Sequence, residues 1–255
     1  MDRDMMKEIR AIGFDLFDTL IVTEHSAREY ALERLVDILR GNGFAVEFDE
    51  FVDAYLAICR QHILQARLNN RETHNSYWIR DTLLRFGYDL PAEDPRISET
   101  IQVYFQEFIN YTRLLPGTLE MLAELKPRYR LGLLSNFTYA PAVRNIINQL
   151  GLQPYLDVVL ISGDTGHRKP GPIAFGKLVE ALQLPRQQVA YIGDNPDTDI
   201  KGAREAGLQP ILTTYGRNFR NQLAGKLVKV PYPEPEPPAP RIDSWEELLE
   251  LLNGK

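Results

Sequence analysis

Patterns typical of strands and helices alternate along the second half of the chain, from Pro116 and Gly117 onward. Short apolar runs that suit buried strands follow segments whose apolar residues recur at three- and four-residue intervals, as on one face of a helix. The expected strands cover residues 131–134, 158–161, 188–192 and 210–213, and the expected helices cover residues 118–125, 141–150, 173–182 and 198–206. This alternation predicts an α/β fold, in which helices cover both faces of a parallel sheet.

A block of helical patterns interrupts this scheme near the start of the chain. A first strand is expected over residues 9–14, a short apolar run that ends before Asp15. Helical patterns then cover residues 26–41, 49–68 and 75–86, and a further segment after Pro95. We therefore expect an α/β core and an all-helical domain inserted after its first strand, with the core made of residues 1–20 and 113–255 and the insertion made of residues 21–112.

The C-terminal segment PYPEPEPPAP, residues 231–240, is rich in proline. Proline fixes its own backbone in the polyproline region, so this segment is expected to be extended. It would carry a last helix, expected over residues 243–252, back onto the core.

Composition argues against several classes of function. The chain has 29 lysine and arginine residues against 35 aspartate and glutamate residues, a net charge of -6, whereas a nucleic-acid-binding surface needs a basic footprint. Cys59 is the single cysteine, so an internal disulfide cannot form. The charged N-terminus and the lack of a long apolar run predict neither a signal peptide nor a membrane-spanning helix. We expect a cytoplasmic protein that is a monomer or a homodimer.

Polar side chains follow the expected strands at their carboxyl ends. In an open parallel sheet, ligands bind outside these ends, at one rim of the sheet. The rim of this chain is expected to collect acidic, hydroxyl, amide and amine groups from Asp15, Ser135, Asn136, Lys169, Asp194 and Asp199.

These groups suit the transfer of a phosphoryl group. A carboxylate such as that of Asp15 can act as a covalent nucleophile. A hydroxyl and an ammonium, here those of Ser135 and Lys169, can hold the anionic oxygens of the transferred group. Magnesium (Mg2+) is commonly held by one or two carboxylates together with a substrate phosphate. Asp15 and Asp194 would supply such a site, with Asp199 nearby.

The chain contains four segments that resemble, in order, the four motifs of the haloacid dehalogenase-like (HAD) hydrolase superfamily: FDLFDTL, LLSNF, GHRKPGPIAF and YIGDNPDTDIKGAREAGL. The helical insertion also lies where subfamily I of this superfamily places its C1 cap. The resemblance covers the whole chain and implies a Rossmann-like, three-layer core with a helical cap domain. It implies a Mg2+-dependent hydrolase, most often a phosphatase that acts on a small phosphorylated metabolite.

The resemblance also assigns a role to each motif residue. Asp15 would be the nucleophile that forms an aspartyl-phosphate, and Ser135 would bind the phosphate. Lys169 would steady both the nucleophile and the phosphoryl group. Asp15 and Asp194 would hold Mg2+, with Asp199 as a further acid of the metal site.

Phe17 departs from the family pattern. The family's phosphatases usually have a second aspartate at this position, which protonates the leaving oxygen and later activates water. Asp18 follows one residue later, but adjacent side chains in a tight turn point in different directions, so we do not expect it to replace that acid. In the family the backbone carbonyl at this position also ligates the metal, and Phe17 retains that carbonyl.

Two alternative functions are compatible with Phe17. An aromatic residue here resembles the 2-haloacid dehalogenase branch, in which Asp15 would attack carbon and expel a halide that needs no proton. That branch lacks a metal, whereas the segment GDNPDTD is intact in this chain, and this favours phosphate chemistry. A phosphatase without the usual acid could act on substrates with good leaving groups, such as acyl phosphates. The second alternative is a non-catalytic module that binds phosphorylated ligands.

Three further polar residues near the motifs are given smaller roles. Asn136 is expected to shape the loop after Ser135 and to contribute to substrate binding. Asp197 is expected to be a turn or N-cap residue. Arg168 is expected either to contact phosphate or to lie at the surface.

Overall fold

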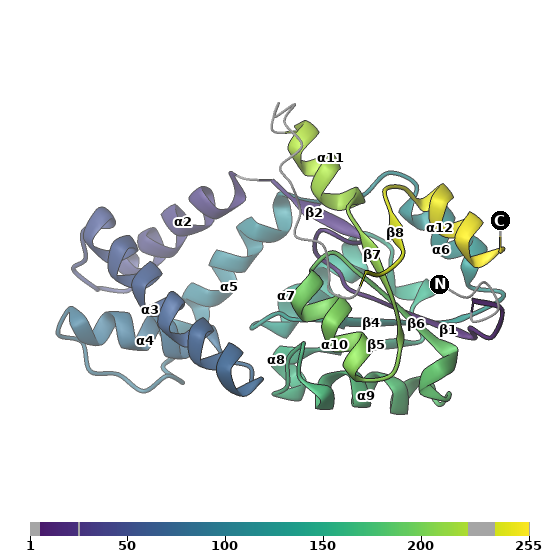
Figure 1. Cartoon of the computed structure of the whole chain (residues 1–255). Helices are drawn as coiled ribbons and strands as arrows, with labels where there is room; N and C mark the ends of the chain where they lie inside the picture. The colour runs from purple at the N-terminus through teal and green to yellow at the C-terminus, as the bar shows by residue number, and fades with distance from the viewer. Residues whose placement is uncertain (1–5, 25, 224–237, 255) are drawn as a thin grey trace.

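Six strands form one parallel sheet within the described part of this computed structural model, which comprises residues 6–24, 26–223 and 238–254 (Figure 1). The strands lie in the order β5–β4–β1–β6–β7–β8. Their bounds are Ala11–Phe14 for β1, Arg130–Ser135 for β4, Val158–Ile161 for β5, Val189–Gly193 for β6, Gln209–Thr213 for β7 and Arg241–Ile242 for β8. The predicted α/β fold is confirmed, and each strand expected from the sequence is present with its ends shifted by at most two residues.

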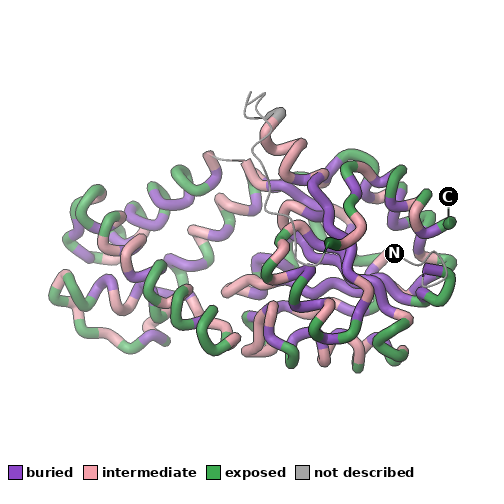
Figure 2. The backbone as a smooth tube through the Cα atoms, viewed as in Figure 1, coloured by how far each residue is buried: buried purple, intermediate pink, exposed green. Residues whose placement is uncertain are grey.

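Helices cover both faces of this sheet. Successive residues of a strand point to opposite faces, so the two faces of β1 pack against different helices. In β1, Ile12 and Phe14 share a buried cluster with α6, α7 and α12, whereas Ala11 shares a second cluster with α9 and α10. Figure 2 shows the strands as largely buried, with exposed residues on the outer sides of the helices. The bounds of these helices are Thr118–Leu125 for α6, Ala140–Gln149 for α7, Pro172–Leu182 for α9, Gly202–Glu205 for α10 and Trp245–Leu252 for α12.

A helical insert, defined here as α2 to α5, lies between strands β2 and β3 in the sequence and beside the sheet in space (Figure 1). Residues 21–23 and 112 belong to the insertion that was expected to be all-helical, but they lie in β2 and β3, which pair antiparallel. The side chains explain this correction, because β-branched residues favour strands and the Thr23 and Thr112 hydroxyls are hydrogen bonded at 3.0 Å. The bounds are Ile21–Thr23 for β2, Ala27–Gly41 for α2, Phe48–Asn69 for α3, Asn75–Arg85 for α4, Pro95–Asn110 for α5 and Thr112–Leu114 for β3.

The remaining elements include several that the sequence pattern did not predict. They are α8 Ser162–Thr165, α11 Tyr215–Leu223, the edge strand β8, and the short turns η1 Gln153–Tyr155 and η2 Arg186–Gln188. The last helix packs on α6 as expected, since the Trp245 indole N–H donates to Thr118 Oγ1 at 3.1 Å. Residues 231–237 of the proline-rich segment lie outside the described residues. Among the described helices, none combines the length and apolar character needed to cross a membrane.

Gly13 in β1 lets the sheet and α9 approach closely. A Cβ atom at Gly13 would lie 2.8 Å from the side chains of both Leu178 and Tyr191. Gly13→Ala should therefore lower the free energy of unfolding by about 1–3 kcal/mol, the usual effect of overpacking a core. Gly176→Ala is the matched control, because nothing lies within 4 Å of its added Cβ and alanine favours helix by about 0.5–1 kcal/mol. Urea unfolding of both variants checks this, and an unaltered Gly13→Ala protein would contradict it.

Candidate active site

The sheet topology brings the motif residues to one rim. Strands β4 and β6 flank β1 in parallel register, so their carboxyl ends lie side by side. Ser135 is the last residue of β4, Asp15 directly follows β1, and Asp194 directly follows β6. The Asp15 N–H donates to the Ile192 carbonyl at 2.9 Å, which ties the end of β1 to β6. Parallel α/β sheets bind ligands at such a point, where the chain turns from one side of the first strand to the other.

Three carboxylates gather at this rim. Oxygens of Asp15, Asp194 and Asp199 all lie within 4.8 Å of one another. Asp199 comes from η3, Pro196–Lys201, a wide helical turn that continues into α10. The helix expected from residue 198 therefore begins two residues earlier, at residue 196, where Asn195 caps it by accepting the N–H groups of residues 197 and 198.

Gly193 allows Asp199 to reach the cluster. A Cβ atom at Gly193 would lie 2.4 Å from Asp199 Cγ, a distance that excludes any side chain. The same carboxylate accepts the Asn195 N–H through Oδ2 at 3.0 Å. Glycine at the end of β6 and the capped turn after it thus fix the third carboxylate against the strand.

Lys169 is the cation of the site. Its ammonium lies 2.8 Å from Asp15 Oδ1 and 2.7 Å from Asp199 Oδ1, and its side chain is 2% exposed. It also donates to the Tyr191 hydroxyl at 2.8 Å, and that hydroxyl donates to the Leu134 carbonyl at 2.9 Å. The ammonium therefore has three partners, the carboxylates of Asp15 and Asp199 in ion pairs and the Tyr191 hydroxyl in a hydrogen bond.

Tyr191 is a site residue that sequence reasoning missed. It lies within the buried strand β6, where the pattern indicates only a core position. One signal was available, because a buried tyrosine needs a hydrogen-bond partner for its hydroxyl. The structure supplies that partner as the Lys169 ammonium.

Asn136 holds the backbone of Lys169. Its side-chain amide donates to the Lys169 carbonyl at 2.9 Å and accepts the Lys169 N–H at 2.8 Å. In the structure this amide joins the loop after β4 to the loop that carries the lysine, and its contribution to substrate binding stays a prediction. Asn136 therefore positions Lys169.

Ser135 lies beside this group with its hydroxyl available. The residue is 1% exposed, and Ser135 Oγ has no hydrogen-bond partner among the residues that the structure describes. Buried hydroxyls are normally hydrogen bonded. An oxygen-rich ligand placed at the rim would satisfy this hydroxyl.

The electrostatics of the carboxylates favour a bound cation. Burial raises the pKa of Asp15 from 3.8 to about 6, although the nearby Lys169 ammonium opposes this shift. Burial, followed by repulsion from Asp199 and Asp15, raises the pKa of Asp194 to about 8. One ammonium therefore leaves the group of three carboxylates with excess negative charge. Mg2+ prefers such hard oxygen ligands, so the carboxylates of Asp15, Asp194 and Asp199 fit this ion.

The side chain of Phe17 points into an aromatic group and not into the polar one. Its ring is stacked on that of Phe137, with centroids 5.1 Å apart, and is tilted against Phe108 of α5 at 6.0 Å. Asp18 has a left-handed backbone, with φ of 56°, and its carboxylate is ion-paired with Arg220 of α11. Phe17, at the position where the family resemblance predicts an acid, therefore forms an aromatic contact between the helical insert and the rim.

Two neighbouring polar residues have contacts that bear on their expected roles. Arg168 does not lie open at the surface, because its guanidinium pairs with Glu72 at 3.1 Å and its side chain is only 12% exposed. Asp197 is an exposed residue of the helical turn after β6, and the N-cap of that turn is Asn195.

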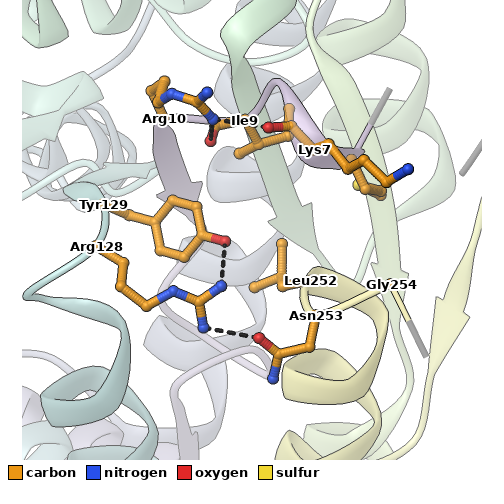
Figure 3. A pocket seen from close by; sticks show the side chains of 9 residues that line it. Lys7, Ile9, Arg10, Arg128, Tyr129, Leu252, Asn253 and Gly254 are labelled. Atoms are coloured by element: carbon orange, nitrogen blue, oxygen red, sulfur yellow. Dashed lines mark hydrogen bonds between the residues drawn. The ribbon is translucent and has the colours of Figure 1, made fainter. Parts of the chain in front are cut away.

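A separate pocket of about 530 Å³, lined by residues that include Lys7, Arg10 and Arg128, lies at the amino-terminal ends of β1 and β4 (Figure 3). The three carboxylates lie at the opposite rim of the sheet. The arginines of the pocket are already hydrogen bonded within the protein. Arg128 donates to the Tyr129 hydroxyl and to Asn253, and Arg10 donates to the carbonyls of residues 7 and 9. The group of side chains that suits catalysis is therefore the one at the carboxyl rim.

Comparison with known proteins identifies the family of the chain. A family model described as haloacid dehalogenase-like hydrolase matches residues 9–207, which is most of the chain and includes the first three motifs and all but the last residue of the fourth. The chain belongs to the haloacid dehalogenase-like hydrolase family, and it is an enzyme of the hydrolase class.

Individual proteins that are similar to this chain share about a quarter of its residues, as the identities of 27%, 25% and 23% show. A glyceraldehyde 3-phosphate phosphatase of Pyrococcus abyssi is 27% identical over 210 residues, covering 82% of this chain and 83% of that protein. A ribulose-1,5-bisphosphate 5-phosphatase of Halopiger xanaduensis is 25% identical over 209 residues, covering 79% and 83%. A 2-haloacid dehalogenase structure from Pseudomonas syringae has a TM-score of 0.71 and 23% identity, covering 96% of this chain and 98% of that one. At this identity the structural likeness shows the fold and not the reaction.

Removing the Tyr191 hydroxyl should destabilise the protein. Tyr191→Phe leaves a Lys169 N–H and the Leu134 carbonyl without their partner in a dry interior, so we expect a loss of about 1–3 kcal/mol in the free energy of unfolding. Tyr129→Phe is the matched control, because its hydroxyl also accepts from a cation, Arg128 at 3.2 Å, but at the other end of the sheet. Urea unfolding compares the two, and an equal or smaller effect of Tyr191→Phe would contradict this account of Lys169.

Mg2+ should stabilise the protein more strongly at high pH. The folded-state pKa values of Asp15 and Asp194, about 6 and about 8, lie above the ordinary 3.8, so the metal-free protein loses stability as the pH rises from about 4 to about 8. A metal binds only the deprotonated carboxylates, and the rise in melting temperature on adding Mg2+ should therefore grow over this range. The Asp194→Asn variant should lose most of this rise. A rise that is independent of pH, or unaffected by Asp194→Asn, would contradict the metal site.

Proposed function

We propose that the protein is a Mg2+-dependent phosphatase that acts on a small phosphorylated metabolite through an aspartyl-phosphate on Asp15. One observation carries this proposal most directly. Asp15 is paired with the ammonium of Lys169 at 2.8 Å and also belongs to the carboxylate cluster with Asp194 and Asp199. The names of the relatives in Pyrococcus and Halopiger support the same reaction class.

The side chains suggest how the first step would proceed. A carboxylate oxygen of Asp15 attacks phosphorus, the bond from phosphorus to the leaving oxygen breaks, and the leaving group carries away the bonding electrons. Lys169 holds Asp15 Oδ1 and so fixes the orientation of the carboxylate. The Ser135 hydroxyl donates to a phosphoryl oxygen. Bound Mg2+ would offset the charge of the phosphate and carboxylates, with the backbone carbonyl of Phe17 as a further ligand.

The second step returns the enzyme to its starting state. Water attacks the phosphorus of the aspartyl-phosphate, the bond between phosphorus and Asp15 breaks, and inorganic phosphate leaves. The water loses one proton to the solution or to the product. Lys169 again faces the carboxylate that is released, and its positive charge stabilises that product.

The aromatic contacts of Phe17 favour a substrate with a good leaving group. Its ring is stacked on Phe137 and cannot donate a proton, and the Asp18 carboxylate is held by Arg220. General acid catalysis typically contributes about 10²–10⁴-fold to a rate. A phosphatase that does without it at this position is best suited to acyl phosphates and similar substrates, whose leaving groups are stable as anions.

The helical insert would act as the cap of the site. We assign residues 21–112 to the cap domain, and residues 1–20 and 113–255 to the core. Closure of the insert over the rim would exclude bulk water from the aspartyl-phosphate. The proposal places the enzyme in the cytoplasm with a small-molecule substrate.

Removing the nucleophile should abolish turnover. We expect Asp15→Asn to lower the rate of phosphate release by about a thousandfold or more, because the amide cannot form the covalent intermediate. The control is Asp197→Asn, an exposed acid close to the site, which should retain activity. The assay measures phosphate release with and without Mg2+ from a panel that contains acyl, aryl and alkyl phosphates, with rates falling in that order.

Two outcomes would contradict the proposal. Halide release from a short 2-haloacid, without phosphate release from any compound of the panel, would identify a dehalogenase. Mg2+-dependent binding of phosphorylated compounds without turnover would identify a binding module.

A further inference from the structure

The helical insert contacts the core through the loop between α3 and α4, residues 70–74. The Glu72 N–H donates to the Gly166 carbonyl at 3.1 Å, and the Arg168 N–H donates to the Asn70 carbonyl at 3.1 Å. Figure 1 shows the end of α3 beside α8, far from the β2–β3 pair that connects the insert to the core. The insert is therefore attached at a second place, directly beside the loop that carries Lys169.

Glu72 inserts a carboxylate into this contact. Its side chain is 2% exposed. Oε1 accepts from the Arg168 guanidinium at 3.1 Å, and Oε2 accepts from the Ser162 hydroxyl at 2.5 Å. A buried carboxylate is tolerated only when it is paired and hydrogen bonded, and both conditions are met here by residues of the core.

The two partners of Glu72 lead to two catalytic loops. Ser162 Oγ accepts the N–H of Phe137 at 2.8 Å, and Phe137 lies two residues after Ser135. Arg168 directly precedes Lys169. One carboxylate from the insert thus connects the loop of the phosphate-binding hydroxyl with the loop of the catalytic lysine.

We propose that Glu72 is a positioning residue that the insert contributes to the catalytic loops. Closure of the insert brings its carboxylate between Ser162 and Arg168, and this sets the loops of Ser135 and Lys169 in their working geometry. The inference rests on the proposed function for its kinetic consequence, but the contact itself does not depend on the reaction catalysed.

The energetics of such a contact suit a reversible closure. In the open state water hydrates both charged groups, and in the closed state they satisfy each other, so the net free-energy difference is small. Removing only the carboxylate is different, because it leaves the Arg168 guanidinium unpaired in the closed state. The variant should therefore favour the open state.

The test uses Glu72→Ala and the nearly isosteric Glu72→Gln, which keeps the fold if the alanine variant does not. The control is Glu47→Gln, which also lies in the insert and pairs with Arg40 at 3.6 Å, but has a side chain that is 84% exposed. Two measurements are made on the full chain. One is kcat and KM for the best phosphate ester with Mg2+, and the other is hydrogen exchange of the backbone amides without substrate.

Both Glu72 variants should exchange faster by about tenfold or more at residues 70–72, 137–138 and 166–168, as expected on losing a hydrogen bond to a charged group. Exchange in β1 and β4 should stay unchanged. With an active enzyme, kcat should fall by about tenfold while KM changes little, and the control should match the wild type.

Unchanged exchange in these loops would overturn the inference. Faster exchange that extends equally through β1 and β4 would also overturn it, because Glu72 would then stabilise the whole fold and not the loops. Normal kcat in variants with faster loop exchange would overturn the positioning role. If no phosphate compound is turned over by the wild type, the proposed function fails, whereas the exchange result still decides whether Glu72 fixes the two loops.

Discussion

The ammonium of Lys169, buried between the carboxylates of Asp15 and Asp199, is the interaction on which the rest of the site depends. A buried ion pair stabilises a protein little, because the loss of hydration offsets the attraction, but it requires a defined geometry. The surrounding residues supply that geometry. Asn136 holds the lysine backbone through two hydrogen bonds, and Tyr191 anchors the ammonium from within the sheet.

The same interaction also explains why the site is suited to a cation. One ammonium faces three carboxylates, and the pKa values of Asp15 and Asp194 are raised to about 6 and about 8 by burial and mutual repulsion. Gly193 makes this crowding possible, since it leaves space for Asp199 against the strand. The site therefore holds excess negative charge that Mg2+ and a phosphoryl group together would complete.

Much of this arrangement was predictable because parallel strands carry their functional residues at one end. The alternating pattern indicates where each strand ends, and so the meeting of Asp15, Ser135 and Asp194 could be expected from the sequence alone. Contacts between distant segments were not predictable in this way. In the sequence Tyr191 resembles any other core residue of a strand, and Glu72 is one of many charged residues in loops. Local periodicity does not show that Tyr191 contacts Lys169 or that Glu72 contacts Arg168. The edge strand β8 was missed for another reason, since its two residues are too short to form a pattern.

Phe17 leaves the phosphate- and metal-binding residues of the site in place, but it limits the substrates that the site can cleave, because it supplies no acid for the leaving group. Its ring contacts Phe108 of the insert and Phe137 of the rim, so this position carries an aromatic contact in place of an acid.

The central claim is that Asp15 attacks phosphorus, and a turnover in water labelled with heavy oxygen tests it most directly. We predict that the label enters the released phosphate and leaves the Asp15 carboxylate unlabelled, because water attacks phosphorus in the second step. Label in the Asp15 carboxylate would contradict the account, since it would show that water attacks the carbon of an ester, as in a dehalogenase.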